Sequence, residues 1–312
     1  MSPTCSVVVC TRNRPDQLGK CLQAISNVSY SNFDVVVVDN GDENERIEHL
    51  AERWNAKYVR EPVIGVSRAR NRGARSCGSE IVAFIDDDAI PDSTWLSNLV
   101  EEFRDPTVMA VTGRIEPLNQ NAYGDVRPCA RGRDKRRLFD AGTRDWFALA
   151  NFGGVGDGAN MAFRRKAFEI WPGFDVRLGL GGTIEGSDEH NAFFELIQRG
   201  SRIVFTPAAI VYHPFPTTLK EARARSFRNL RAAFAYMTLL FVEQPRYRIP
   251  LARFLARSIF RRILGKATNV IHSRRHELVA IAGSFEYWSS RHDHRRGSPP
   301  LAADSNVIKT FE

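Results

Sequence analysis

The chain has 312 residues, of which 43% are hydrophobic and 26% are charged, with a formal net charge of +8. This composition is typical of a folded globular protein with a sizeable core, in one large domain or one domain with an appendage, and it excludes disordered and fibrous classes. The basicity is local, because residues 220–275 carry 14 Lys and Arg against two acidic residues.

The cysteines and the N-terminus indicate the compartment. Five cysteines, an odd number without a CxxC pair, predict neither a disulfide framework nor a zinc site and favour a reducing environment. The N-terminus lacks the basic and apolar regions of a signal peptide. The longest apolar run, 232–242, is short of the ~20 residues that span a bilayer. We therefore expect a cytoplasmic protein, either free or peripheral at the inner face of the cell membrane.

The first third of the chain alternates short β-branched runs with amphipathic segments. Unbroken apolar runs of this length are typical of strands buried on both faces. The alternation predicts an α/β protein with a largely parallel sheet. The predicted strands are 6–10, 34–39, 57–59 and 80–85, and the predicted helices are 15–25, 44–54 and 67–76.

The remaining segments are less regular. A polar stretch, 119–145, lacks periodicity and predicts a long mobile loop of the kind that often forms a lid. The tail 291–312 is rich in Pro, Ser and charge, which predicts disorder. Further helices are predicted at 93–103, 219–242 and 250–264, and further strands at 108–115 and 203–205.

Three consecutive aspartates, Asp86, Asp87 and Asp88, follow the predicted strand 80–85. Ligands of open α/β sheets bind beyond the carboxyl ends of the strands. Adjacent carboxylates repel one another, whereas Mg²⁺ or Mn²⁺ accepts oxygen ligands and bridges to phosphates. The cluster therefore predicts a metal–diphosphate site. The alternative is an acidic helix start, since Asp is favoured at caps and first turns.

Two other strand ends carry polar residues. Asp39 closes the strand 34–39 and can accept hydrogen bonds from a nucleobase or ribose; the alternative is an ordinary Asn-Gly turn. Thr11 and Arg14 follow the first strand, where the backbone can line a nucleotide pocket. The alternative there is a helix start with Pro15 at its first position.

These segments together resemble the donor half of glycosyltransferase family 2, which has the GT-A fold, a Rossmann-like and mostly parallel sheet flanked by helices. The resemblance implies that Asp39 binds the base and that Asp86 and Asp88 hold the metal and the donor diphosphate. It also implies that Arg70 and Asn71 lie beside the donor. The matching segments are SVVVCTRNR (6–14), VVVVDN (35–40), GVSRARNRGA (65–74) and IVAFIDDD (81–88).

The resemblance continues into an acceptor half, to about residue 215. The segment 156–168, GDGANMAFRRKAF, is similar to a family motif and makes Gly158 and Asn160 candidate acceptor-binding residues. Another, WPGFD (171–175), is similar to the family's Gly-Gly-Phe-Asp. His213 resembles a strand-end histidine that reaches the metal in some relatives; a structural role is the alternative.

The catalytic base is expected at Asp188 or Glu189, where the family places Glu-Asp at a helix start. This chain reverses the order. Counting back from Gly200 favours Glu189, whereas residue type favours Asp188, and both stay candidates. The alternative is a pair of helix-start carboxylates that the macrodipole stabilises.

The resemblance implies an inverting glycosyltransferase that depends on Mn²⁺ or Mg²⁺, with a UDP-sugar favoured as donor and a glycan or lipid-linked acceptor, in cell-surface glycan or polysaccharide synthesis. A metal would stabilise the leaving diphosphate, and a carboxylate would take the acceptor's proton. We expect a catalytic domain over 1–215, divided into a donor half (1–115) and an acceptor half (116–215), and a helical basic C-terminal extension over 216–290.

The extension has a basic amphipathic pattern. Such a helix favours contact with an anionic membrane surface, and packing on the catalytic domain is the equal alternative. Nucleic acid is not an expected partner, because no recognition helix or aromatic-interleaved RNA motif is evident. The basic positions are Arg253, Arg257 and Arg261, and the apolar positions are Leu251, Leu255 and Ile259.

Two other functions compete with glycosyl transfer. A sugar nucleotidyltransferase would show a Gly-rich phosphate loop near the N-terminus, and residues 11–15 lack that glycine density. The second competing function is that of a non-catalytic protein with the same fold, which binds a sugar nucleotide or associates with a membrane. The reversed order of Asp188 and Glu189 favours this alternative.

Overall fold

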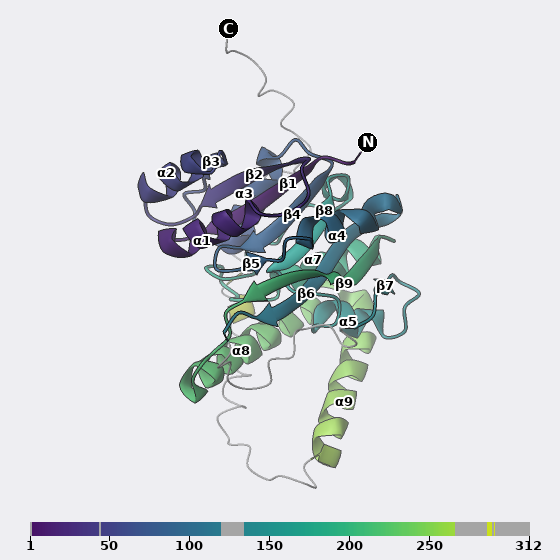
Figure 1. The fold of residues 1–312 in the computed structure, drawn as a ribbon. Helices are drawn as coiled ribbons and strands as arrows, with labels where there is room; N and C mark the ends of the chain where they lie inside the picture. Colours follow the sequence, from purple (N-terminus) through teal and green to yellow (C-terminus); the bar gives the residue numbers. More distant parts are fainter. Residues whose placement is uncertain (1, 44, 120–133, 266–285, 289, 291–312) are drawn as a thin grey trace.

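A computed structural model describes residues 2–43, 45–119, 134–265, 286–288 and 290 (Figure 1). Within the last helix, side chains are described as far as residue 258. The tail predicted to be disordered, 291–312, lies outside the described residues, as does most of the predicted loop 119–145.

One mixed sheet forms the centre of the molecule, in the order β3-β2-β1-β4-β8-β6-β9-β5, with β7 beside β9. The first four strands are parallel neighbours, β8 is antiparallel to β4 and to β6, and β9 is parallel to β6. The carboxyl ends of β1, β2, β4, β6 and β9 therefore meet at one edge. The strands are β1 (Cys5–Thr11), β2 (Phe33–Asp39), β3 (Lys57–Arg60), β4 (Ile81–Asp86), β5 (Ile90–Pro91), β6 (Val108–Pro117), β7 (Arg137–Phe139), β8 (Asn160–Arg164) and β9 (Arg202–His213).

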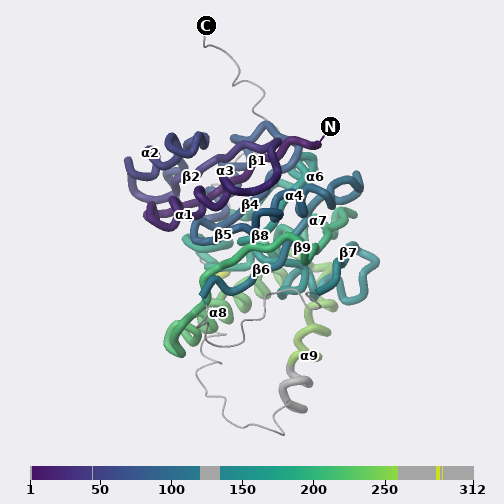
Figure 2. Tube along the Cα trace, viewed as in Figure 1, coloured from purple at the N-terminus to yellow at the C-terminus, as the bar shows by residue number. Residues whose placement is uncertain are grey.

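Helices cover both faces of the sheet (Figures 1 and 2). Side chains alternate between the faces, so Val7 and Val9 lie in one core with α1, α2 and α4, and Val8 lies in the other with α3, α7 and α8. The helices are α1 (Pro15–Ile25), α2 (Glu45–Arg53), α3 (Val66–Ser76), α4 (Trp95–Glu101), α5 (Trp146–Asn151), α6 (Ala167–Ile170), α7 (Asp188–Gln198), α8 (Leu219–Glu243) and α9 (Arg248–Gly265), with short 3₁₀ turns at Glu102–Arg104 and Pro245–Tyr247.

Local sequence explains how two of these helices are placed. A Cβ at Gly73 would lie 2.4 Å from Cγ1 of Val8, so only glycine lets α3 pack this closely on β1. The helix α8 begins with a capping box, in which Thr218 and Glu221 each accept a hydrogen bond from the other's backbone N–H. The capping box fixes the start of α8 at Leu219, with five residues between it and the end of β9.

Most predicted elements are confirmed within one or two residues, and α1 matches its predicted bounds. The loop prediction for 119–145 is wrong at Arg137–Phe139, which pairs with β9 as β7. Three residues are too few to show an alternating pattern. The predicted strand 203–205 is the start of the longer β9, which continues to His213.

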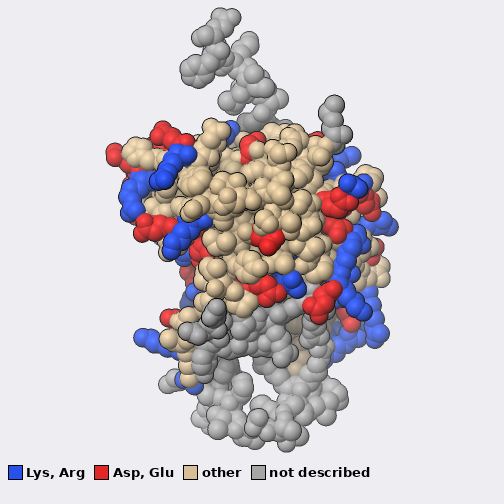
Figure 3. Space-filling model, in the orientation of Figure 1, with Lys and Arg blue, Asp and Glu red and all other residues tan. Residues whose placement is uncertain are grey.

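The C-terminal helices pack on the rest of the chain over their described length. Leu251 of α9 is buried in the core that contains α8, and Arg257 donates to Asp145 at 2.7 Å. None of the described helices combines the length and apolar character needed to cross a bilayer. On the face drawn in Figure 3, Lys and Arg lie among Asp and Glu rather than forming one basic surface.

Candidate active site

The candidate site begins where parallel strands end together. The register pairs Thr11 with Asp39 and Cys10 with Asp86, so the ends of β1, β2 and β4 are level. His213 ends β9, which runs in the same direction two strands beyond β8. The sheet therefore brings side chains from four separate parts of the sequence to one edge, as the motifs predicted.

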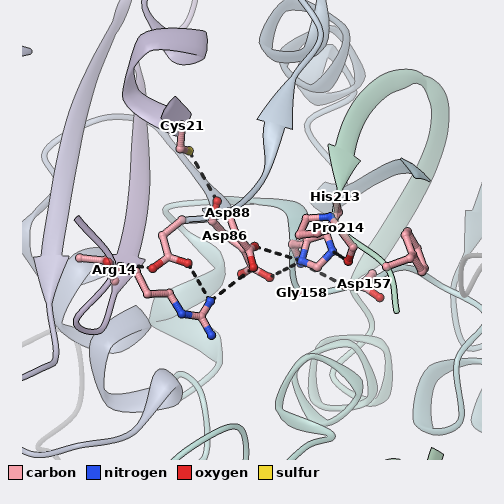
Figure 4. Close-up of polar contacts among 12 residues, drawn as sticks. Arg14, Cys21, Asp86, Asp88, Asp157, Gly158, His213 and Pro214 are labelled. Carbon is pink, nitrogen blue, oxygen red and sulfur yellow. Dashed lines mark hydrogen bonds and ion pairs between the residues drawn. The ribbon is translucent and has the colours of Figure 1, made fainter. Parts of the chain in front are cut away.

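Three side chains converge at this edge (Figure 4). Nε2 of His213 lies 3.2 Å from Oδ1 of Asp88 and 3.6 Å from Oδ2 of Asp86. One ligand atom of each residue lies within 4.8 Å of the others. Burial lowers the pKa of His213, but the two carboxylates outweigh it and raise the pKa to about 10. Burial raises the pKa of Asp86, but the bond to His213 and the charge of Arg70 hold it below its usual value.

This cluster fits a divalent cation. Two carboxylate oxygens and one imidazole nitrogen are ligands that Mn²⁺ and Mg²⁺ sites use, and side chains from only two strand ends leave coordination positions for phosphate oxygens. Asp86 and Asp88 are both partly exposed to the cleft. To bind a metal, His213 would have to be neutral at the coordinating nitrogen, so metal binding would release a proton from the imidazole.

Asp87 turns away from its two neighbours. It accepts a hydrogen bond of 2.7 Å from the hydroxyl of Thr11, and Arg14 contacts it at 3.2 Å. Burial raises the pKa of Asp87 to about 6, with Thr11 and Arg14 opposing that rise. Arg14 also lies 3.3 Å from Asp88. The guanidinium thus stands beside the cluster, where it can contact a donor phosphate.

Asp39 is fully buried at the end of β2. Its carboxylate accepts hydrogen bonds from Tyr58 at 3.1 Å and from the backbone of Gly41 at 3.0 Å, and Arg60 lies 3.8 Å away. Next to it, the amide of Asn40 lines the cleft and bonds the backbone of 61–65. Asp39 itself does not line the cleft, so binding of a base would require its carboxylate to become accessible and to accept a further hydrogen bond beside these donors.

Arg70 joins the two halves of the site from the middle of α3. Its buried guanidinium forms an ion pair with Asp188 at the start of α7 and lies 3.4 Å from Asp86. It also donates to the carbonyl of Gly158 at 3.2 Å. A Cβ at residue 158 would lie 2.8 Å from Nη2 of Arg70, so glycine allows this approach. The negative charge of Asp188 is thereby committed to Arg70.

Glu189 follows on α7 and lines the cleft. Burial raises its pKa well above the usual value, and the charges of Asp188 and Asp157 add to the effect. His190, whose pKa burial lowers, is therefore a neutral neighbour, and its Nε2 lies 3.8 Å from Oε1 of Glu189. Glu189 is thus a carboxyl group with high proton affinity and no ion-pair partner of its own in the described residues.

Two predicted residues lie beneath the cleft rather than on its wall. Both amide atoms of Asn71 bond the backbone of Phe174, at 2.8 Å each. Asn160 accepts from the indole of Trp95 and donates to two carbonyls. Their hydrogen-bonding capacity is used within the protein, so both residues position neighbouring segments.

The cleft has a volume of about 1110 Å³ and extends from the carboxylates to α8 and α9. Arg225, Arg228, Leu230, Phe234 and Met237 of α8 line it. These residues were not among the predicted site residues, because the charge of the C-terminal region favoured an outer surface. The i, i+4, i+7 spacing of the three apolar residues was the available signal.

Residues 6–171 match the family model described as Glycosyl transferase family 2. The chain belongs to this family. The predicted family resemblance and the predicted GT-A fold are both confirmed. The fold is also that of the mannosyltransferase PcManGT from Pyrobaculum calidifontis, solved in complex with GDP-Man and Mn²⁺, with a TM-score of 0.57 and 19% identity over 97% of this chain and 78% of that one.

Two relatives in sequence are covered to different extents. The pre-mycofactocin glycosyltransferase of Mycobacterium tuberculosis is 28% identical over 224 residues, which are 70% of this chain and 44% of the relative. The succinoglycan biosynthesis protein ExoM of Rhizobium meliloti is 27% identical over 240 residues, 74% of each chain. The chain thus spans less than half of the first relative.

Proposed function

We propose that this family 2 chain transfers a sugar from a nucleotide-diphosphate sugar to an acceptor hydroxyl with inversion. One observation carries the proposal: Asp86, Asp88 and His213 share a single cleft with Glu189. One end of that cleft suits a cation and a diphosphate, and the other offers a carboxyl group that can take a proton. The relatives in cell-surface glycan synthesis support the same class of reaction.

The donor end is proposed to work through charge. Asp86, Asp88 and His213 would hold Mn²⁺ or Mg²⁺, which supplies stabilisation of the negative charge on the leaving nucleoside diphosphate. Arg14, beside Asp88, would contact a phosphate oxygen. Asp39 would orient the base, and uracil is the favoured base.

Glu189 is proposed as the base. The acceptor oxygen forms a bond to the anomeric carbon, the bond from that carbon to the phosphate oxygen breaks, and the acceptor proton passes to Glu189. The raised pKa of Glu189 supports this role, whereas the carboxylate of Asp188 is held in an ion pair with Arg70. Because Glu189 must be ionised to accept a proton, turnover should rise as pH increases through its raised pKa.

A thermal-shift series tests the donor site. UDP and GDP are each added with and without Mn²⁺, and a nucleotide diphosphate that binds the folded state should raise the melting temperature by several degrees only with the metal. Release of nucleotide from a panel of UDP- and GDP-sugars then tests catalysis. A chain that binds nucleotide but releases none from any donor would be a binding protein.

A further inference from the structure

His190 carries a buried nitrogen to which the proposed reaction assigns no role. It lies in the first turn of α7, directly after Glu189, and lines the same cleft. Its Nε2 is shielded from solvent and has no hydrogen-bond partner among the described residues. A buried polar atom without a partner destabilises a folded chain, so a nitrogen kept in this state beside the base points to a function.

The carboxyl group of Glu189 lies close to this nitrogen. Oε1 of Glu189 is 3.8 Å from Nε2 of His190, which is beyond hydrogen-bond distance, and the two side chains are only 17% and 20% exposed. Catalytic hydrogen bonds are often long before substrate binds and shorten in the complex. A closure of ~1 Å would turn this contact into a hydrogen bond that is shielded from water.

The charges around the pair favour a hydrogen bond rather than an ion pair. Burial lowers the pKa of His190, so its imidazole is neutral and carries one N–H. Burial and two neighbouring carboxylates raise the pKa of Glu189, so the ionised base gains from a donor at its side. The other charged or titratable groups that face the pair from α7, α3, α8 and the turn before β8 are Asp188, Arg70, Tyr236 and Asp157.

We propose that His190 is a positioning residue for the base: its Nε2–H donates a hydrogen bond to the carboxylate of Glu189 and favours the ionised form. This inference rests on the proposed function and adds a second residue to its base. A hydrogen bond to an ionised acceptor is about twice as strong as a neutral one, so the carboxylate gains more from His190 than the protonated group does. The proton of the acceptor passes to Glu189, and His190 keeps its own.

The pH dependence of donor hydrolysis tests this assignment, with water as the acceptor. The probe is the UDP- or GDP-sugar that the unmodified chain turns over fastest, at saturating concentration with Mn²⁺. His190→Leu should move the acid limb of kcat to higher pH by ~1 unit, which is a ~10-fold loss on that limb. Above the limb the two proteins should agree, because Glu189 is then ionised in both. His190→Gln keeps an N–H donor and should restore most of the limb.

His49→Leu is the matched control, since His49 is an exposed histidine of α2 that does not line the cleft. It should leave the limb unchanged. An acid limb that His190→Leu does not move, a loss that is equal at every pH, or an equal shift in the control would overturn the proposal. His190→Phe, which keeps a ring without nitrogen, takes the same test if the leucine variant does not fold. If the unmodified chain released nucleotide from no donor, the proposed function itself would fail.

Discussion

Replacing Glu189 with Gln should separate activity from stability. As a general base, the carboxylate contributes ~10²- to 10⁴-fold to turnover, which corresponds to ~3–5 kcal/mol of the barrier. The same group is costly to the folded protein, because it is buried beside Asp188 and Asp157. We therefore expect Glu189→Gln to lower kcat by that factor while it raises the free energy of unfolding at neutral pH.

The direction of the pKa shift determines whether the ionised Glu189 raises or lowers the free energy of unfolding. A glutamate in the unfolded chain has a pKa of about 4.3, and burial raises that of Glu189 in the folded chain. Above about pH 4.3 the folded state holds a proton that the unfolded state releases, so stability falls as pH rises through the folded pKa. Each tenfold difference in proton affinity contributes about 1.4 kcal/mol. The groups facing Glu189 are Asp157, Asp188, His190, Arg70 and Tyr236.

Asp188→Asn provides the contrast on the neighbouring residue. It breaks a buried ion pair, which costs ~3–5 kcal/mol, and the remaining contacts of Arg70 with Asp86 and Gly158 place the loss at the lower end. The two variants should thus change stability in opposite directions.

Urea unfolding at pH 5 and pH 8 measures both effects, and turnover at saturating donor measures catalysis. The advantage of Glu189→Gln over the unmodified chain should be larger at pH 8 than at pH 5. Equal advantages at the two pH values would show that the buried carboxyl group is not perturbed as argued. A variant that kept kcat within a factor of three would remove Glu189 from the role of base.

Three other changes have defined outcomes. Asp88→Asn should abolish the Mn²⁺-dependent thermal shift with nucleotide diphosphate and lower kcat/KM by at least 100-fold, and an intact metal-dependent shift would contradict the metal assignment. Arg177→Met should lower the free energy of unfolding in urea by ~2–4 kcal/mol, because Asp175 and Glu243 at the end of α8 lose their buried partner; a loss below ~0.5 kcal/mol would show that these ion pairs contribute little to stability. Tyr58→Phe removes one donor to Asp39 and should change KM for the donor several-fold with kcat unaltered, as steady-state kinetics will show.

The strand-end motifs could be predicted from sequence because each depends on neighbouring residues. Apolar runs fix the strands, and a parallel sheet brings their carboxyl ends together, which is enough to place Asp39 and Asp86 at one edge. His213 was predicted from the family resemblance alone, because the predicted strand ended at residue 205. The base could not be assigned in the same way. What distinguishes the two residues is that Arg70 pairs with Asp188 and not with Glu189. That contact joins residues 118 positions apart, so local sequence does not reveal it.

The contribution of α8 to the cleft could not be predicted from the sequence for a related reason. The spacing of Leu230, Phe234 and Met237 places them on one face of the helix, but spacing alone does not say whether the protein core or a cleft lies against that face. Asn71 and Asn160 stay predicted site residues, although their amide groups form hydrogen bonds within the protein. Amide side chains suit both ligands and buried backbone groups, and only the hydrogen bonds around them tell which use is made.

Arg70 also limits how this chain can be recombined with its relatives. Its guanidinium contacts Asp86, which comes before residue 116, and Asp188, which comes after it, so neither segment contains its full set of charges. A chimera joined near residue 116 would leave one buried charge unpaired unless the other parent supplied an equivalent partner. Side chains on the cleft face of α8 can instead be exchanged without dividing that pair.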